Sequence, residues 1–183
     1  MNLIGTKTIE TDRLILRRFT LEDAERMFEN WASDPEVTKY LTWEAHASVE
    51  DTRSILSDWV GRYGEGGFFE WAIEWKEIGQ PIGSIGVVAL DERIGEAEVG
   101  YCIGREYWGR GIMPEALRAV MDFLFDEVGA SRVKAKHDAE NPKSGRVMAK
   151  AGMIYEGTYR CAGYNNRGII DVVCYAMLAS DRK

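Results

Sequence analysis

The sequence is poor in the residues that hold metal ions and cross-links. It has only three cysteines, Cys102, Cys161 and Cys174, and two histidines, His46 and His137. An odd number of cysteines without a CxxC pair argues against a disulfide framework or a zinc site. The two histidines lie far apart in sequence, so a metal site or a histidine-based triad has few candidates. We therefore expect a protein of a reducing compartment, the cytoplasm, that holds no metal.

Long apolar runs and excess positive charge are also missing. No apolar run approaches the roughly 20 residues that span a bilayer, and residues 1–10 lack the basic and apolar parts of a secretory signal. The formal net charge is −7, which argues against a general nucleic-acid binder. An acidic protein suits a basic partner or substrate such as an amine. We expect neither a membrane nor a nucleic acid as partner.

The chain length and the order of expected elements indicate one domain over residues 1–183. A chain of 183 residues can bury a core without cross-links. Alternation and turn residues predict strands over residues 13–19, 68–75, 81–90, 97–103, 132–137, 155–163 and 170–178. Capping patterns predict helices after Thr20, Asp34, Ser48 and Asn141, and another over about Pro114–Val128. The fold class is therefore α+β, a mixed sheet with flanking helices.

The most informative segment is a strand, a glycine-bearing turn and a helix start. Its sequence is Val99-Gly100-Tyr101-Cys102-Ile103, followed by Trp108-Gly109-Arg110-Gly111-Ile112-Met113-Pro114. Free N–H groups at a helix start can hold a phosphate, and glycines let the backbone approach it closely. It is neither a Walker loop nor a GxGxxG fingerprint. Spacing alone leaves a purely structural turn as the alternative.

This segment resembles motif A of the GNAT acetyltransferases, [QR]-x-x-G-x-[GA]. Trp108, Gly111 and Met113 fall on its three defined positions, and only Gly111 matches the consensus. Trp-Gly-x-Gly is common in the ribosomal-protein N-acetyltransferase branch (RimJ/RimL-like). Further matches in order along the chain are Arg13-Leu14-Ile15-Leu16-Arg17, Asn141-Pro142-Lys143-Ser144, Lys150-Ala151-Gly152-Met153, Glu156-Gly157, and Asp171 with Tyr175.

The resemblance implies a GNAT fold, with a mostly antiparallel twisted sheet of about seven strands, and acetyl-CoA as cosubstrate. It implies that backbone groups of Tyr101, Cys102 and Ile103 hold the pantetheine arm. The pyrophosphate is expected on the turn formed by Gly109, Arg110, Gly111, Ile112, Met113 and Pro114. Asn141 is expected near the CoA arm, although helix capping explains it equally well. A homodimer is an expectation from the family alone.

Two side chains are the candidates for acid–base chemistry. Ser144 matches a serine that protonates the leaving thiolate in Rim-type enzymes, while the tyrosine used by many GNAT enzymes is replaced by Met148. Glu70 is the first candidate for the base, because a carboxylate in the apolar stretch 68–73 would have a raised pKa if buried. A solvent-facing Glu70 is the alternative reading. Glu98 is the second candidate for the base, with an exposed strand start as its alternative reading, and a water chain is the remaining option. For Ser144 the alternative is an exposed residue in the first turn of a helix.

The expected activity is N-acetylation of a primary amine, with a protein α-amino group as the leading acceptor. Such a group has a pKa of about 7.7–8.0, so it loses its proton more easily than a lysine at about 10.4. A small amine such as an antibiotic, polyamine or amino acid is the alternative acceptor. A CoA-binding module without turnover is a further alternative. Trp31, Tyr40, Trp43 and Trp59 are expected in the core, some of them lining the acceptor site.

Overall fold

One eight-stranded sheet runs through residues 1–182, the part of the chain that the computed structural model describes. The strands are β1 (Ile9–Glu10), β2 (Leu14–Arg17), β3 (Glu70–Trp75), β4 (Gln80–Asp91), β5 (Glu96–Ile103), β6 (Arg132–Asp138), β7 (Ile154–Asn165) and β8 (Gly168–Leu178). Their order across the sheet is β1-β2-β3-β4-β5-β6-β8-β7. Neighbouring strands are antiparallel except β5 and β6, which are parallel. The expected sheet is confirmed, and the short β1 brings it to eight strands.

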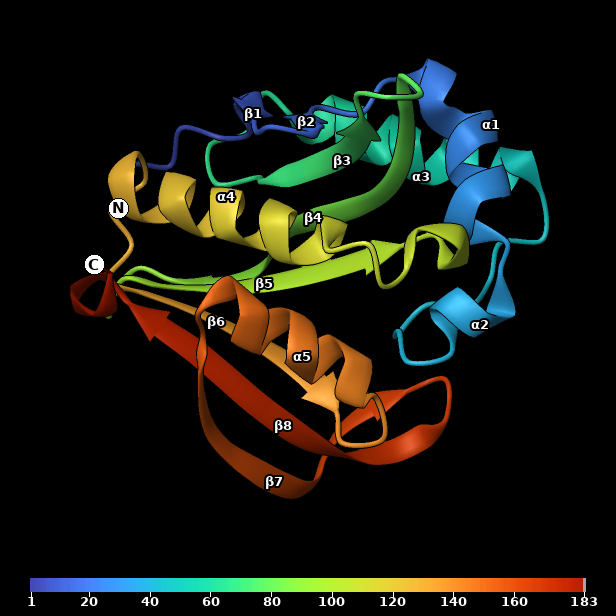
Figure 1. Ribbon diagram of the computed structural model, residues 1–183. Coiled ribbons are helices and arrows are strands. Elements are labelled where there is room, and N and C mark those ends of the chain that lie inside the picture. Colours follow the sequence, from blue (N-terminus) through green and yellow to red (C-terminus); the bar gives the residue numbers. More distant parts are fainter. Residues whose placement is uncertain (183) are drawn as a thin grey trace.

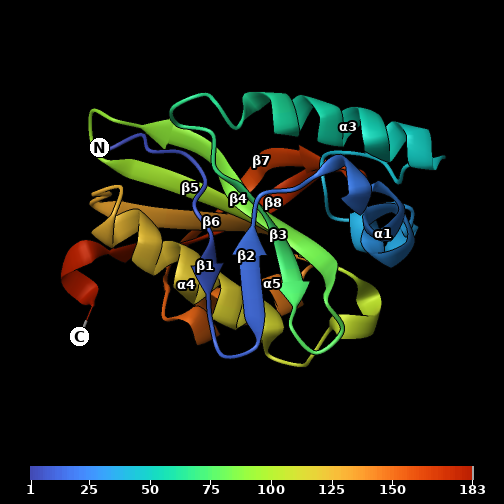
Figure 2. The ribbon, with the colours of Figure 1, turned by 90° about the horizontal axis from the view of Figure 1, so that it is seen from above.

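Helices cover both faces of the sheet, as Figures 1 and 2 show. They are α1 (Ala24–Met27), α2 (Pro35–Thr38), α3 (Val49–Arg62), α4 (Ile112–Asp126) and α5 (Pro142–Ala151). Helices α4 and α5 lie on one face, and their apolar side chains form the larger core with Leu16, Trp71 and Ile85. Helices α1 and α3 lie on the other face and form a second core around Trp31 and Ala72. Each central strand therefore sends alternate side chains to two different layers.

Two helix starts follow their capping signals. Asp51 N–H donates to the Ser48 hydroxyl at 3.2 Å, and the Asp51 carboxylate accepts from Ser48 N–H at 2.9 Å. The Asn141 side chain accepts from Ser144 N–H at 3.4 Å, and Pro142 occupies the first position of α5. Each cap satisfies N–H groups that lack a partner within the helix. Asn141 thus has the structural role that its position predicts.

Two expected helices differ from the structure. Helix α4 begins at Ile112, two residues earlier than expected, because Gly111 provides a left-handed cap with φ of 74°. The expected helix after Thr20 is divided into a 3₁₀ turn (Leu21–Asp23), α1, and a π turn (Phe28–Ala32). Ser33 donates its N–H and its hydroxyl to the Phe28 carbonyl, which closes the wider π turn.

Candidate active site

The parallel strands β5 and β6 are paired at one end and separated at the other. Their pairing covers only residues 96–98 of β5 and 132–134 of β6, although the strands continue to Ile103 and Asp138. From residue 99 onward, β5 keeps its partner β4, and β6 keeps β8. One backbone edge of β5 therefore opens toward a gap between the strands. An extended ligand arm can bond to such an edge as an added strand would.

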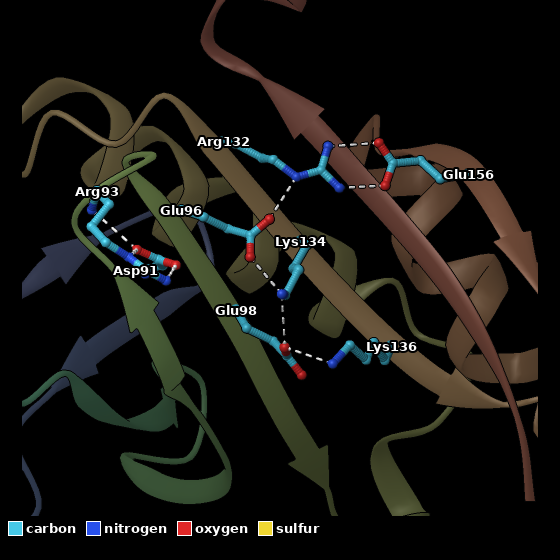
Figure 3. Close-up of polar contacts among 8 residues, drawn as sticks. All are labelled: Asp91, Arg93, Glu96, Glu98, Arg132, Lys134, Lys136 and Glu156. Carbon is cyan, nitrogen blue, oxygen red and sulfur yellow. Dashed lines mark hydrogen bonds and ion pairs between the residues drawn. The ribbon is translucent and has the colours of Figure 1, made fainter. Parts of the chain in front are cut away.

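Side chains tie the paired end together (Figure 3). The Glu96 carboxylate accepts from Arg132 at 2.7 Å and from Lys134 at 2.5 Å. Glu98 pairs with Lys136 at 2.9 Å and with Lys134 at 3.4 Å, and Arg132 also pairs with Glu156 on β7. We call these six residues the ion-pair ladder. The ion-pair ladder joins β5, β6 and β7 at the end where β5 and β6 are paired over only three residues. It includes Glu98, the second candidate for the base, which is ion-paired with two lysines.

The glycine turn lies at the start of α4, beyond the open end of β5. Gly109 and Gly111 have φ of 78° and 74°, in the left-handed region that favours glycine. An added Cβ at Gly109 would meet no atom within 4 Å, and one at Gly111 would meet only Arg13 at 3.7 Å. The Ile112 and Met113 side chains are buried in the core. These residues can therefore offer a phosphate only their backbone N–H groups.

Arg110 and the start of α5 border the same turn. The Arg110 guanidinium lies 5.5 Å from the centre of the Trp75 ring, and the Arg110 carbonyl accepts from Arg13 at 3.0 Å. The Lys143 ammonium on α5 lies 4.6 Å from the Trp108 ring. The predicted pyrophosphate turn and the first turn of α5 are thus neighbours, although the residues come from distant parts of the sequence.

Tyr101 and Ser144 meet across the opening. The Tyr101 side chain points from β5 toward α5, and its hydroxyl lies 3.0 Å from the Ser144 hydroxyl and 3.2 Å from the Ser144 carbonyl. Burial raises the pKa of the Tyr101 phenol, although the hydrogen bond with Ser144 opposes that rise. Tyr101 therefore stays protonated at neutral pH and can donate. The predicted thiol-protonating serine has a phenol as its direct partner.

Glu70 lies on the opposite face of the sheet. Burial raises its pKa from 4.5 to about 8, although a hydrogen bond from Ser84 opposes that rise. The carboxylate lies over Gly86 on β4, where an added Cβ would come within 1.9 Å of its Oε2 atom. Glu70 is therefore partly buried against the sheet, with a proton affinity suited to a base near neutral pH.

Cys102 follows Tyr101 and points to the Glu70 face. Its sulfur lies 3.5 Å from the Ser84 hydroxyl oxygen. Burial raises the pKa of the Cys102 thiol to about 11, although the hydrogen bond with Ser84 opposes that rise. The thiol is therefore protonated at neutral pH and is a weak nucleophile. This argues against an acetyl-cysteine intermediate at this position.

Aromatic side chains surround the Glu70 face. Trp43, Trp59 and Trp108 are partly buried and pack with Cys102 against the second core, whereas Trp31 is fully buried. The turn between β7 and β8 closes on the segment before α3, since the Asn166 amide donates to the carbonyls of Thr38 and Trp43 at 2.9 and 2.8 Å. Of the predicted aromatic group, Tyr40, Trp43 and Trp59 are partly exposed and could contact an acceptor, whereas Trp31 could not.

Sequence reasoning missed three contributions. It treated Tyr101 as a backbone contact only, and it did not consider Ser84 or Gly86. The available signal was the run Gly83-Ser84-Ile85-Gly86, in which small and polar residues interrupt an otherwise apolar strand. Small residues in a strand interior commonly mark the close approach of another group.

Comparison with known proteins agrees with this geometry. Residues 13–154 match the family described as Acetyltransferase (GNAT) domain. The chain belongs to the GNAT acetyltransferase family. This GNAT protein is 35% identical to the N-acetyltransferase YoaA of Bacillus subtilis (strain 168) over 170 residues, covering 93% of this chain and 96% of YoaA. The expected enzyme class, an acyltransferase, is thereby confirmed.

The RimJ/RimL-like branch is also represented among the proteins to which this acetyltransferase is similar. The ribosomal-protein-serine acetyltransferase of Escherichia coli (strain K12) is 29% identical over 139 residues, covering 75% of this chain and 76% of that protein. The structure of RimL, a ribosomal L7/L12 α-N-protein acetyltransferase in complex with coenzyme A, superposes with a TM-score of 0.84. It covers 96% of this chain and 100% of RimL at 21% identity, so that likeness concerns the fold.

Two further features concern metals and membranes. Residues 1–182 contain no group of three or more histidine, cysteine, aspartate or glutamate side chains placed to hold a metal ion. None of the helices in that part of the acetyltransferase has the length and hydropathy to cross a bilayer.

Proposed function

We propose that this GNAT acetyltransferase moves the acetyl group of acetyl-CoA to a primary amine, with a protein N-terminal α-amino group as the leading acceptor. One observation carries the proposal: Tyr101 and Ser144 lie on one face of the sheet, and Glu70, Ser84 and Cys102 lie on the other face across β3, β4 and β5. A proton donor and a proton acceptor are thus placed on the two faces of one sheet. Acetyl transfer from a thioester to an amine needs one of each.

The edge of β5 at Tyr101, Cys102 and Ile103, which β6 does not pair, supports a site for the pantetheine arm. At its end the Ile103 carbonyl accepts from the Trp108 indole N–H at 2.9 Å. Hydrogen bonds from this edge would continue the sheet into the opening, as in strand addition. The glycine turn supports a site for the pyrophosphate, because the first N–H groups of α4 are free and the helix dipole favours an anion. Arg110 adds a positive charge at this turn. Asn141 would act mainly by holding α5 and Ser144 in place.

The Glu70 carboxylate would accept the proton of the incoming ammonium, directly or through one water molecule. The neutral amine nitrogen then attacks the thioester carbonyl carbon, and a backbone N–H near Cys102 would stabilise the negative oxygen. The carbon–sulfur bond breaks as the carbon–nitrogen bond forms. Ser144, hydrogen-bonded to Tyr101, would give its proton to the departing thiolate. The second proton lost by the attached nitrogen would pass to water, and water would return a proton to Ser144.

An α-amino acceptor is favoured by its low pKa and by the branch to which the chain is similar. With Glu70 near pKa 8, proton transfer from an α-ammonium at about 7.7–8.0 is nearly balanced, whereas a lysine at about 10.4 is a much poorer donor. The partly buried Trp43 and Trp59 offer apolar surface for the first side chains of a peptide. RimL and the serine acetyltransferase carry names that describe action on ribosomal proteins.

A three-way acceptor screen tests this proposal. The acceptors are a lysine-free peptide with a free N-terminus, an N-terminally blocked peptide with one lysine, and a small polyamine such as spermidine. Release of CoA is measured, and the products are identified by mass spectrometry. Preference for the free N-terminus supports the proposal, and turnover of spermidine alone would replace it with a small-amine acceptor. Binding of acetyl-CoA without turnover of any amine would indicate a CoA-binding module.

A further inference from the structure

Three polar side chains form a line across β3, β4 and β5 on the acceptor face. Strand register places Glu70 opposite Gly86, and Ser84 opposite Cys102. Ser84 is a buried polar residue, 8% exposed. Its hydroxyl lies 3.5 Å from the Cys102 sulfur. Ser84 and Glu70 face the same side of neighbouring strands, two residues apart in the register, so the hydroxyl is within reach of the carboxylate. Ser84 therefore connects the candidate base with the strand whose edge is open.

The chemistry of the three groups fixes the direction of their hydrogen bonds. An ionised carboxylate only accepts, so the single Ser84 hydroxyl hydrogen must point to Glu70. The remaining lone pairs of Ser84 then accept from the Cys102 thiol, which is a weak donor when protonated. When Glu70 carries a proton, both bonds can reverse by rotation of the hydroxyl and the thiol, without movement of a heavy atom.

Gly86 determines where the Glu70 carboxylate rests. A Cβ at this position would lie 1.9 Å from Glu70 Oε2 and 2.8 Å from the Phe69 carbonyl oxygen. The absence of a side chain there lets the carboxylate lie flat against β4, next to Ser84. Other titratable groups near Glu70 are Tyr63, which directly follows α3 and whose hydroxyl donates to the Glu70 carbonyl at 3.0 Å, and Cys102. Burial raises the pKa of both, so Glu70 titrates alone near neutral pH.

We propose that Ser84 is a positioning residue for the base: it accepts from the Cys102 thiol and donates to Glu70, holding the carboxylate toward the open edge of β5. The inference rests on the proposed function, in which Glu70 takes the proton of the acceptor amine. Ser84 and Cys102 do not themselves react. Their effect is to stabilise the ionised carboxylate, which would otherwise be less populated at neutral pH.

An NMR titration of Glu70 tests this inference without requiring turnover. The carboxyl ¹³C resonance of Glu70 is assigned by its loss in Glu70→Gln and followed against pH in the wild type and in Ser84→Ala. Loss of a hydrogen bond to the charged carboxylate disfavours its ionised form, so the midpoint should rise by about one pH unit in Ser84→Ala. Cys102→Ser retains a donor to Ser84 and should keep the wild-type midpoint, whereas Cys102→Ala should shift it upward by less than Ser84→Ala does.

Ser144→Ala is the matched control, because Ser144 lies on the other face of β5. It should leave the Glu70 midpoint unchanged. Equal midpoints in the wild type and Ser84→Ala would overturn the inference, as would a Ser84→Ala protein that merely melts earlier with the same titration. A shifted midpoint in a protein that acetylates no amine would instead reject the proposed function and keep the hydrogen-bonded chain.

Kinetics give a second readout once an acceptor is known. Ser84→Ala should lower kcat/KM for the acceptor about tenfold below pH 7, because a one-unit rise in pKa lowers the ionised fraction of the base tenfold. The rate should recover at high pH, and KM for acetyl-CoA should stay the same. A loss of kcat that is equal at every pH would contradict a positioning role.

Discussion

Strands β5 and β6 are closed by ion pairs at one end and open at the other, and the two ends differ in what their side chains do. At the closed end, Glu96 and Glu98 are each bonded to cations of β6. At the open end, Tyr101 and Cys102 extend to opposite faces and contact serines instead of charges. The ion pairs at the closed end stabilise the fold. The hydrogen bonds at the open end join uncharged groups that can donate or accept a proton.

The surroundings of Glu98 and Glu70 also differ, and this difference indicates which of them can act as the general base. Glu98 faces Lys134 and Lys136, and its carboxylate is engaged in ion pairs with both. Glu70 makes no ion pair within residues 1–182, and burial raises its pKa to about 8. A carboxyl in the second environment can accept and release a proton near neutral pH.

The largest expected effect on activity comes from replacing Ser144 at the open end of the two strands, with Ser131 at the closed end as the comparison. Ser144→Ala should lower kcat by about 10²–10⁴-fold, the usual range for loss of a positioned proton donor. Its melting temperature should change little, because the α5 cap is made by Asn141 and the Ser144 backbone. Ser131→Ala, an exposed serine beside the closed end of β6, is the control and should keep full kcat. Full activity in Ser144→Ala would remove it from the mechanism.

The two glutamates provide the next comparison. Glu70→Gln keeps the shape and removes the basicity, so kcat/KM should fall about 100-fold near pH 7. It should recover in part at high pH, where the amine is already neutral. Glu98→Gln should keep the wild-type pH profile. A pH–rate series on one acceptor separates them, and the reverse pattern would assign the base to Glu98.

Thermal melting against pH checks the Glu70 environment without any substrate. Its pKa is raised in the folded protein to about 8, from about 4.3 in an unfolded chain. Its stabilising contribution is therefore complete below about pH 4 and is lost as the pH rises through about 8. Glu70→Gln lacks this loss, so it should melt at the same temperature as the wild type at pH 4 and increasingly above it toward pH 8. Parallel curves would show that the carboxyl is not held in a buried site.

The ion-pair ladder should matter for stability and little for chemistry. Hydrogen bonds from Lys134 and Arg132 outweigh burial and lower the pKa of Glu96. Its contribution is present above about pH 4.3 and is lost as the pH falls through the lowered pKa. Glu96→Gln should cost about 1–2 kcal/mol at pH 7, between the values of exposed and buried pairs.

The exposed pair of Asp91 with Arg93, drawn in Figure 3 beside the ladder, is the control. Asp91→Asn should hardly change the melting temperature, because the Arg93 side chain is 87% exposed. Chemical denaturation at pH 7 and at pH 4 compares the two variants. Equal losses for Glu96→Gln and Asp91→Asn would mean that the ladder does not hold the closed end.

Local signals predicted the fold better than they predicted the site. The strand meander, the Ser48 and Asn141 caps and the glycine turn each depend on a few neighbouring residues, and each is present. The partners of Glu70 could not be predicted, because bulges after Ile73 and near Val87 shift the register that brings Ser84 beside it. The Tyr101–Ser144 contact likewise joins residues 43 positions apart and depends on how β5 and α5 pack.

Binding of acetyl-CoA to a pair of matched variants tests the central claim, that the open end of β5 and the start of α4 form the CoA site. Gly111 and Gly129 lie near opposite ends of α4 and have φ of 74° and 75°. An added Cβ atom would not be crowded by a neighbouring atom at either position. Gly111→Asp and Gly129→Asp therefore impose similar backbone strain and the same charge at two places. Isothermal titration calorimetry with acetyl-CoA compares them with the wild type.

Gly111→Asp should weaken acetyl-CoA binding at least about tenfold, because like charges about 4 Å apart repel by a few kcal/mol near a protein surface. Gly111→Asn should weaken it less, and Gly129→Asp should bind as the wild type does. Equal affinity of folded Gly111→Asp and Gly129→Asp for acetyl-CoA would contradict the placement of the cosubstrate at this end of the two strands.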